Sequence, residues 1–243
     1  MNIKSLSDRL QIIAQEVPLG SKIIDIGTDH GYLPIHLVKE NKIQEAIATD
    51  VNQGPLQSAA AKINQEQLHH KIETRYGNGL NVTKVKDNID TVVIAGMGGP
   101  LITSILDEGQ DPLQTVKKLI LQPNVRAKEI RIWLCEHGWF LTNEHILEED
   151  NKFYEILVAE PGNGAQPYSS DQEKREKELL FGPYLSQKQN LAFKKKWERE
   201  KIQWQNILAN LEKAEMSETV SEKRAALSEK IRRVEEVIHH ETS

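Results

Sequence analysis

The spacing of apolar and polar positions changes along the chain and predicts two structural regions. In the first region, short segments rich in β-branched residues predict strands, and longer segments between them have the spacing of amphipathic helices. The predicted strands are 22–26, 45–50, 71–77, 89–96, 118–123, 139–150 and 152–160, and the predicted helices are 31–41, 53–66, 99–109 and 125–137. Because strands and helices alternate, we expect an α/β domain with a mostly parallel, doubly wound sheet that ends in an antiparallel edge hairpin. A leading helix is predicted by four apolar positions that share one face, Leu6, Leu10, Ile13 and Val17.

The second region is a highly charged, helix-favouring tail over residues 171–243. Its apolar residues follow heptad spacing in two stripes, which are Trp197, Trp204, Leu208 and Leu211, and then Val220, Leu227, Ile231, Val234 and Ile238. The segment "MSETVSEK" separates the stripes, and Ser217 is suited to cap the second helix. We therefore predict an α-helical coiled-coil hairpin, with one long dimerising helix as the alternative. Residues 161–170, rich in Gly, Pro and Ser, are predicted to link it to the first domain, residues 1–160.

The two regions differ in charge. The 243 residues include 31 Lys and Arg against 36 Asp and Glu, a net charge of −5. Residues 171–243 contain 15 basic and 14 acidic residues (+1), so residues 1–170 contain 16 and 22 (−6). The overall acidity argues against non-specific binding of nucleic acids. However, "FKKKWEREK" is a candidate for binding RNA phosphates, with an exposed helix face as the alternative; its basic residues are Lys194, Lys195, Lys196, Arg199 and Lys201.

The composition also argues against several classes of protein. No apolar segment is long enough to cross a membrane, so no membrane association is expected. The single cysteine, Cys135, excludes an intrachain disulfide and fits a reducing cytoplasm, which is the predicted location. The adjacent histidines at 69–70 and 239–240 lack further ligands at suitable spacing, so no metal site is predicted.

The segment "DIGTDHGYLP", residues 25–34, follows the first predicted strand and has the glycine turn of a nucleotide-binding fold. It lacks the third glycine of a dinucleotide fingerprint, and no Walker loop is present, so the ligand is not expected to be held by phosphates. Its carboxylates, Asp25 and Asp29, suit a cationic adenosyl compound such as S-adenosylmethionine, which has a sulfonium and an ammonium group. Asp50 ends the next strand, 23 residues after Gly27, where a carboxylate accepts hydrogen bonds from ribose hydroxyls. The alternatives are a turn role for Asp50 and a helix N-cap for Asp29.

Two later glycine loops are expected at the same edge of the sheet. "GNGL", residues 77–80, follows the third strand, where an Asn side chain can hydrogen-bond the amino group of adenine. "AGMGG", residues 95–99, follows the fourth strand, at the carboxyl edge where ligands of open α/β sheets bind. Its glycines allow the backbone to approach a ligand closely, and a tight turn before a helix is the alternative.

The segments "DIGTDHGYLP", "GNGL", "VVIAGMGG" and "LILQPN", in this order and spacing, resemble the bacterial TrmK family of tRNA (adenine-N1)-methyltransferases. The resemblance extends over nearly the whole chain and departs at Gly31, where the family often has Ala. It implies a Rossmann-like class I methyltransferase sheet, S-adenosylmethionine as the cofactor, and methylation of the adenine at position 22 in the D-arm of tRNA. The residues that it implies for cofactor binding are Arg9, Asp25, Gly27, His30, Asp50, Asn78, Gly79, Ala95, Gly96 and Met97.

The resemblance places Asp29 and Tyr32 at the methyl-transfer centre, as the catalytic candidates. Adenine N1 has an in-plane lone pair, so we expect in-line displacement at the sulfonium carbon, with orientation as the main source of catalysis. Asp29 would stabilise the charge of the methylated base or accept its amino proton. Tyr32 would stack on the extruded base, with a core tyrosine as the alternative. Gln122 and Asn124 of "QPN" are predicted to line the base pocket.

Other functions are compatible with parts of this pattern. Within the same fold, the chain could methylate another RNA, a protein or a small molecule. From another class, it could be a cofactor-binding RNA scaffold without catalysis. A nicotinamide dehydrogenase is disfavoured because the glycine pattern is wrong. We expect a monomer that binds tRNA, with dimerisation through the C-terminal helices as the alternative.

Overall fold

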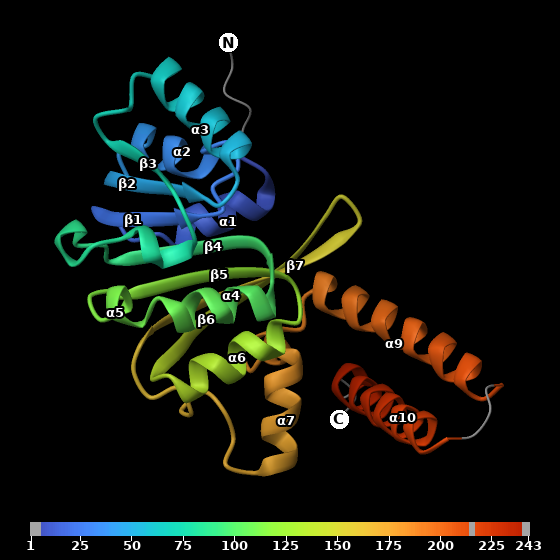
Figure 1. The fold of residues 1–243 in the computed structure, drawn as a ribbon. Helices are drawn as coiled ribbons and strands as arrows, with labels where there is room; N and C mark the ends of the chain where they lie inside the picture. The colour runs from blue at the N-terminus through green and yellow to red at the C-terminus, as the bar shows by residue number, and fades with distance from the viewer. Residues whose placement is uncertain (1–5, 214–216, 240–243) are drawn as a thin grey trace. The chain divides into compact units, whose positions relative to one another are not determined.

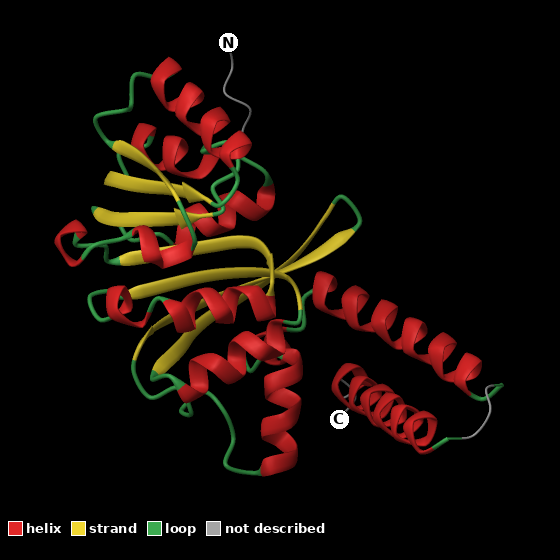
Figure 2. Ribbon diagram, viewed as in Figure 1, coloured by secondary structure: helices red, strands yellow, loops and turns green. Residues whose placement is uncertain are grey.

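The computed structural model describes residues 6–213 and 217–239. The chain divides into two compact units between Ser169 and Ser170. The first unit is a sheet covered by helices on both faces (Figures 1 and 2). Its strands are β1 (Ser21–Ile26), β2 (Ile43–Asp50), β3 (Ile72–Tyr76), β4 (Thr91–Gly98), β5 (Lys118–Val125), β6 (Trp139–Glu149) and β7 (Lys152–Pro161). Its helices are α1 (Asp8–Glu16), α2 (Tyr32–Lys39), α3 (Gln53–Gln65), α4 (Gly99–Glu108), α5 (Gln110–Leu113) and α6 (Ala127–Glu136), with 3₁₀ turns η1 (Gly79–Val82) and η2 (Val85–Asp87).

The seven strands lie in the order β3-β2-β1-β4-β5-β7-β6. Strands β3, β2, β1, β4 and β5 are parallel, whereas β7 is antiparallel to both β5 and β6. This order confirms the predicted parallel sheet with an antiparallel hairpin at one edge. Because β1 lies between β2 and β4, the chain crosses from one half of the sheet to the other there, and ligands of such sheets bind in the crevice at the carboxyl ends of these strands.

Both faces of the central strands are buried, as expected of a parallel sheet. In β1, the neighbouring residues Ile23 and Ile24 point to opposite faces, and both are fully buried. One face packs against α1, α2 and α3, through residues such as Ile13 and Leu37. Helices α4 and α6 contact each other and the other half of the sheet. The core is therefore continuous across the strands that end at the predicted cofactor loops.

The segment predicted as a linker, residues 161–170, packs against the first unit almost to its end. Tyr168 is only 8% exposed. At Gly164, a Cβ atom would lie 2.4 Å from the carbonyl oxygen of Leu134, so this glycine allows the chain to lie directly on the end of α6. Polar composition predicted the break between the units, but the break comes only after Tyr168.

The second unit is helical, and two of its helices form a hairpin within the chain. The helices are α7 (Gln172–Phe181), α8 (Leu185–Lys188), α9 (Leu191–Leu211) and α10 (Glu218–His239). Near the start of α9, Gln189 Nε2 donates a hydrogen bond to the carbonyl oxygen of Val237, close to the end of α10, at 3.0 Å. Just after the end of α9, Glu212 Oε1 lies 3.8 Å from Nη2 of Arg224, near the start of α10. The helices are therefore antiparallel, and the alternative of one long helix is wrong.

The hairpin is stabilised by an aromatic cluster and a partly buried apolar stripe. The rings of Phe181 and Trp197 lie 4.6 Å apart between centroids, in an edge-to-face arrangement. Val234 of α10 is fully buried. As predicted, Ser217 caps α10, since its Oγ accepts a hydrogen bond from the Val220 amide at 3.3 Å.

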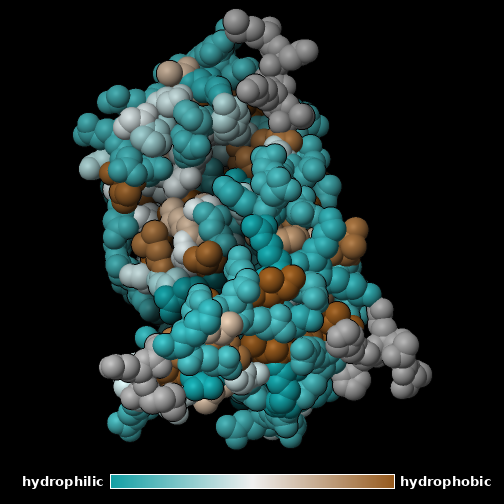
Figure 3. All heavy atoms as spheres, turned by 90° about the vertical axis from the view of Figure 1, so that its right-hand side faces the viewer, coloured by the Kyte–Doolittle hydropathy of each residue, from teal (hydrophilic) through white to brown (hydrophobic). Residues whose placement is uncertain are grey.

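Figure 3 shows one face of the molecule, where hydrophilic side chains predominate and hydrophobic ones gather in small patches.

Candidate functional site

A cavity of about 400 Å³ lies at the carboxyl edge of the sheet, where β1 and β4 end. This volume is within the range of small-molecule binding sites. Its lining comes from α1, the end of β1 and the turn after it, the start of α2, the ends of β4 and β5, and the start of β7. The lining residues are Arg9, Leu10, Asp25, Gly27, Thr28, Asp29, Tyr32, Leu33, Ala95, Gly96, Asn124 and Tyr154.

The turn after β1 has an unusual backbone that depends on its glycines. Gly27, Asp29 and Gly31 all have positive φ angles, of 74°, 50° and 68°. A Cβ atom at Gly27 would lie 2.4 Å from Cε of Met97, so a side chain at this position would displace the end of the methionine side chain. Helix α2 has Gly31 as its N-cap, without a side-chain hydrogen bond. The helix-cap alternative for Asp29 is therefore wrong.

Asp25, at the end of β1, is a carboxylate that is 5% exposed. Its Oδ2 accepts a hydrogen bond from Thr28 Oγ1 at 2.6 Å. Burial raises the pKa of Asp25 to about 6, and the negative Asp50 adds to the rise. The Thr28 hydrogen bond and the positive charge of Arg9 oppose this rise of the pKa. A cationic ligand in the cavity would favour the ionised carboxylate of Asp25, as the positive charge of Arg9 does.

A hydrogen-bond network connects α1, β4 and β5 behind the cavity. Gln122 is fully buried, and its Oε1 accepts hydrogen bonds from Arg9 Nη1 and, at 3.1 Å, from the Gly96 amide. Its Nε2 donates to Asn124 Oδ1 at 3.3 Å, and Asn124 Nδ2 donates to the Gly96 carbonyl at 2.7 Å. Asn124 therefore lines the cavity, whereas Gln122 lies behind it and fixes its neighbours. The prediction that Gln122 also lines a base pocket does not agree with this burial.

Arg9 of α1 extends into the cavity beside Tyr154 of β7. Its guanidinium carbon lies 5.2 Å from the centre of the Tyr154 ring, a cation–π contact. Among the described residues, the buried Nε of Arg9 has no hydrogen-bond partner. A buried donor without an acceptor is costly, and the carboxylate of an amino-acid ligand would satisfy it. This orphan donor, the buried Asp25 and the narrow turn at Gly27 fit S-adenosylmethionine.

The two catalytic candidates, Asp29 and Tyr32, precede and follow Gly31 in the sequence. The side chain of Asp29 is 71% exposed, and its Oδ1 lies 3.5 Å from His30 Nε2. His30 in turn shares a hydrogen bond of 2.7 Å with Ser58 Oγ, which ties the turn to α3. The Tyr32 ring is half-buried, and Lys62 Nζ lies 3.6 Å from its centroid. Asp29 and Tyr32 both line the cavity, but Lys62 covers one face of the tyrosine ring.

Several predicted cofactor residues lie along the same edge but do not line this cavity. Asp50 Oδ1 accepts a hydrogen bond from the Asn52 amide at 2.7 Å, as its turn alternative predicts. Asn78 Nδ2 donates to Glu108 Oε2 at 2.9 Å. The others outside the lining are His30, Gly79 and Met97. Their roles in binding a cofactor stay predictions.

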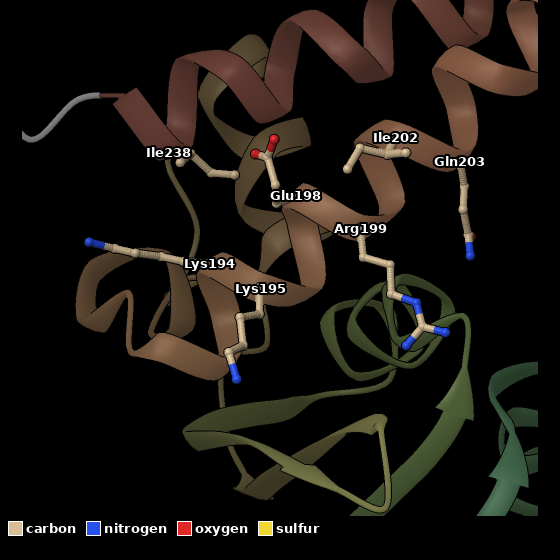
Figure 4. Close-up of a pocket in the computed structure, with 7 residues that line it drawn as sticks. All are labelled: Lys194, Lys195, Glu198, Arg199, Ile202, Gln203 and Ile238. Atoms are coloured by element: carbon tan, nitrogen blue, oxygen red, sulfur yellow. The ribbon is translucent and has the colours of Figure 1, made fainter.

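The basic cluster of the second unit lies on α9. Lys194, Lys195 and Arg199 line a groove of about 530 Å³ together with apolar residues of α9 and α10. Figure 4 shows Lys195 and Arg199 projecting from α9 on the side opposite α10. Two further members of the cluster contact neighbours on α9: Lys196 Nζ lies 4.5 Å from the centre of the Trp197 ring, and Lys201 Nζ lies 3.0 Å from Glu198 Oε1. The structure therefore brings the predicted phosphate-binding residues onto one helix.

Sequence reasoning missed four residues of the cavity, Leu10, Thr28, Leu33 and Tyr154. Thr28 could have been found, because it lies inside the quoted turn and three residues after Asp25. Tyr154 carried no such signal, because it lies beside Arg9 only through the packing of β7 against α1, which is distant in the sequence. No group of three or more metal-ligating side chains occurs among residues 6–213 and 217–239. In the same part of the chain, no helix is both long and apolar enough to span a membrane.

The strand order, together with the cavity at the carboxyl ends of β1 and β4, is that of a class I methyltransferase. A family model described as tRNA (adenine(22)-N(1))-methyltransferase, TrmK, matches residues 23–236. The chain belongs to this family. A Bacillus subtilis enzyme described as tRNA (adenine(22)-N(1))-methyltransferase is 41% identical over 240 residues, covering 99% of this chain and all of the relative.

Solved structures agree with this assignment. The Bacillus subtilis m1A22 tRNA methyltransferase TrmK superposes with a TM-score of 0.89 at 39% identity, covering 96% of this chain and 99% of that one. A Streptococcus pneumoniae putative tRNA (m1A22) methyltransferase, in complex with S-adenosyl-L-methionine, superposes with a TM-score of 0.85 at 40% identity. The match covers 97% of this chain and 100% of that one. These findings confirm the predicted family, fold class, enzyme class and cofactor.

Proposed function

We propose that this chain transfers a methyl group from S-adenosylmethionine to N1 of the adenine at position 22 of tRNA. The observation that carries the proposal is the cavity at the carboxyl edge of the sheet, in a chain of this family. There a buried carboxylate, Asp25, and an orphan buried donor, Arg9 Nε, lie around one small-molecule site.

The residues around the cavity suit the separate parts of the cofactor. S-adenosylmethionine supplies a methyl group on a positively charged sulfur atom. Arg9 would donate to the methionine carboxylate, and Asp25 would compensate the positive charge of the ammonium group. Asp50 and Asn78, at the ends of the next two strands, would bind the ribose and the adenine. Met97, which lies against Gly27, would separate the cofactor from the target base.

For the target adenine, the chain offers positioning groups more than a strong base. N1 is already nucleophilic, so the main requirement is to hold it in line with the transferred carbon. Asn124 lines the cavity and would contact the base, while Gln122 holds Asn124 in place. Asp29 would compensate the positive charge of the methylated base, and Tyr32 would stack on it.

We further propose that tRNA docks on the basic cluster of α9. Lysine and arginine side chains on one helix can follow a phosphate backbone without reading its sequence. The enzyme would work as a monomer in the cytoplasm, which is supported by a hairpin that closes within one chain and by the single cysteine.

The test is transfer of labelled methyl groups to unmodified tRNA transcripts, followed by digestion and nucleoside analysis. We expect 1-methyladenosine with a transcript that has adenine at position 22, and none when guanine replaces it. Methylation at a different position, or of protein instead of RNA, would identify another substrate. No transfer with saturating cofactor would favour the non-catalytic scaffold.

A further inference from the structure

A second groove, of about 880 Å³, lies beside the edge strand β3. Its lining comes from the end of β3 and from the segment with η1 and η2. It includes Asn78, the residue predicted to contact the cofactor adenine. Tyr76, another lining residue, is paired across the sheet with Asp50, the predicted ribose anchor. The groove therefore lies at the same edge of the sheet as the predicted cofactor loops.

An exposed aromatic side chain is the main feature of this groove. Tyr76 is the last residue of β3 and is 60% exposed. Within the described residues, its ring and hydroxyl have no partner. An exposed aromatic ring in a polar groove is a platform on which a nucleobase can stack, and such stacking is independent of base identity.

An arginine holds the loop that forms the opposite wall. Arg75 donates hydrogen bonds to the carboxylates of Glu73 and Asp87, and its Nη1 donates to the Val82 carbonyl at 3.1 Å. Asp87 is 7% exposed, and the Arg75 hydrogen bonds lower the pKa of Asp87 to about 2. Its Oδ2 also accepts a hydrogen bond from the Lys84 amide at 2.7 Å. These contacts connect the loop to the end of β3.

Two lysines on this loop supply the positive charge of the groove. Lys84 and Lys86 are exposed, and neither ammonium group has an ion-pair partner in the part of the chain that the structure describes. Arg75 contacts two carboxylates, Glu73 and Asp87, so these three residues together have a charge of −1, and the two lysines bring the groove to +1. The lysines therefore remain for an anionic ligand. A free lysine pair beside a free aromatic ring has the chemistry of a single-stranded nucleotide site, with phosphate on one side and base on the other.

We propose that this groove is a second RNA-binding subsite, in which an unstacked nucleotide of the tRNA substrate stacks on Tyr76 while Lys84 and Lys86 bind its phosphates. The proposal rests on the proposed function, because it takes tRNA as the substrate. The subsite would bind the RNA at the β3 edge of the first unit, in addition to the basic cluster on α9 of the second unit.

The test is equilibrium binding of the tRNA transcript to the full-length protein, measured by fluorescence anisotropy at several salt concentrations. Tyr76→Ala should weaken binding about tenfold, since base–aromatic stacking contributes substantially to single-strand binding. Tyr76→Phe should bind like the wild type, because the ring is kept. The double variant Lys84→Gln with Lys86→Gln should reduce the slope of log K against log salt concentration by about 1.5.

Lys117→Gln is the matched control, since Lys117 is exposed just before β5, at the opposite end of the strands. It should leave both the affinity and the salt slope unchanged. All variants should bind S-adenosylmethionine like the wild type, which separates loss of RNA binding from misfolding. Wild-type tRNA affinity in Tyr76→Ala, or an unchanged salt slope in the lysine variant, would overturn the proposal. If the wild type methylates adenine 22 while these variants bind tRNA normally, only the subsite is wrong and the proposed function stands.

Discussion

The cofactor cavity and the basic cluster of α9 use charge in opposite ways. In the cavity, Asp25 is almost completely buried, and Arg9 is held by a hydrogen bond to the buried Gln122. On α9, by contrast, Lys195 and Arg199 are exposed. A small cationic ligand that leaves water can be bound by a few fixed, buried groups, whereas RNA phosphates remain hydrated and are bound by many exposed ones. The cavity should therefore respond to pH and to single substitutions, and the hairpin to salt and to summed charge.

The sharpest way to separate the two regions is to remove the second one. Truncation after Ser169 should lower tRNA methylation about 100-fold or more, because the phosphate contacts of the hairpin would be lost together. The affinity for S-adenosylmethionine should stay the same, since every residue of the cavity precedes the cut. The measurements are labelled-methyl transfer and calorimetric cofactor binding.

The position of this cut is important. A cut at residue 165 would remove Tyr168, which is buried in the first unit, and could unfold the domain for an unrelated reason. A full-length variant with Lys195→Glu and Arg199→Glu tests the same contacts without a truncation. It should also lower tRNA methylation, and its tRNA affinity should depend less on salt concentration. Normal tRNA methylation by the truncated chain would show that the first unit alone recognises tRNA.

A single substitution should have its largest effect in the cavity. Arg9→Met should weaken cofactor binding about 10- to 100-fold, because a hydrogen bond to a charged group contributes about 1.5–3 kcal/mol. Methionine keeps the packing against Tyr154 but removes every donor. The measurement is calorimetric titration with S-adenosylmethionine.

Tyr154→Phe is the matched control, since it keeps the ring under the guanidinium. It should bind the cofactor like the wild type. Wild-type affinity in Arg9→Met would show that the orphan Nε of Arg9 is not a ligand contact.

The same contrast explains what the sequence could predict. The strands and the turns at Gly27 and Gly96 are local features, so spacing and residue type were sufficient for them. The network around Gln122 and the position of Tyr154 depend on strand pairing between distant segments, which no local pattern encodes. The groove beside Tyr76 was missed because its lysines, Lys84 and Lys86, come from a short segment at η2 that has no distinctive sequence pattern. Composition predicted a linker at residues 161–170, but it did not predict that this segment packs on the end of α6 through Gly164.

The pH dependence of the cavity should follow Asp25. The folded state raises the pKa of Asp25 from 3.8 to about 6, so it binds a proton more tightly than the unfolded chain. The free energy of unfolding should therefore fall as pH rises from about 4 to about 6, by about 3 kcal/mol, and then remain constant with respect to this group. Thermal or urea unfolding of the ligand-free protein checks this, and Asp25→Asn should remove this part of the dependence.

Cofactor binding should show the opposite trend with pH. Ionised Asp25 attracts the cationic ligand, so the affinity should rise up to about tenfold per pH unit below the pKa and level off above it. Arg9→Met should move this midpoint upwards, because the positive charge of Arg9 lowers the pKa of Asp25. An affinity that is independent of pH between 5 and 7 would show that Asp25 does not face the ligand's charge.

The smallest effect is expected at Asp29, whose carboxylate is 71% exposed and thus well screened. Asp29→Asn should lower the turnover of tRNA methylation by about three- to tenfold, because only part of the charge stabilisation reaches the base. Asparagine is the suitable replacement, since it tolerates the left-handed backbone at this position, where φ is 50°. Asp29→Ala would add backbone strain and confuse the result. Turnover is measured with saturating cofactor; if it is unchanged and cofactor affinity is normal, Asp29 shapes the turn and has no catalytic role.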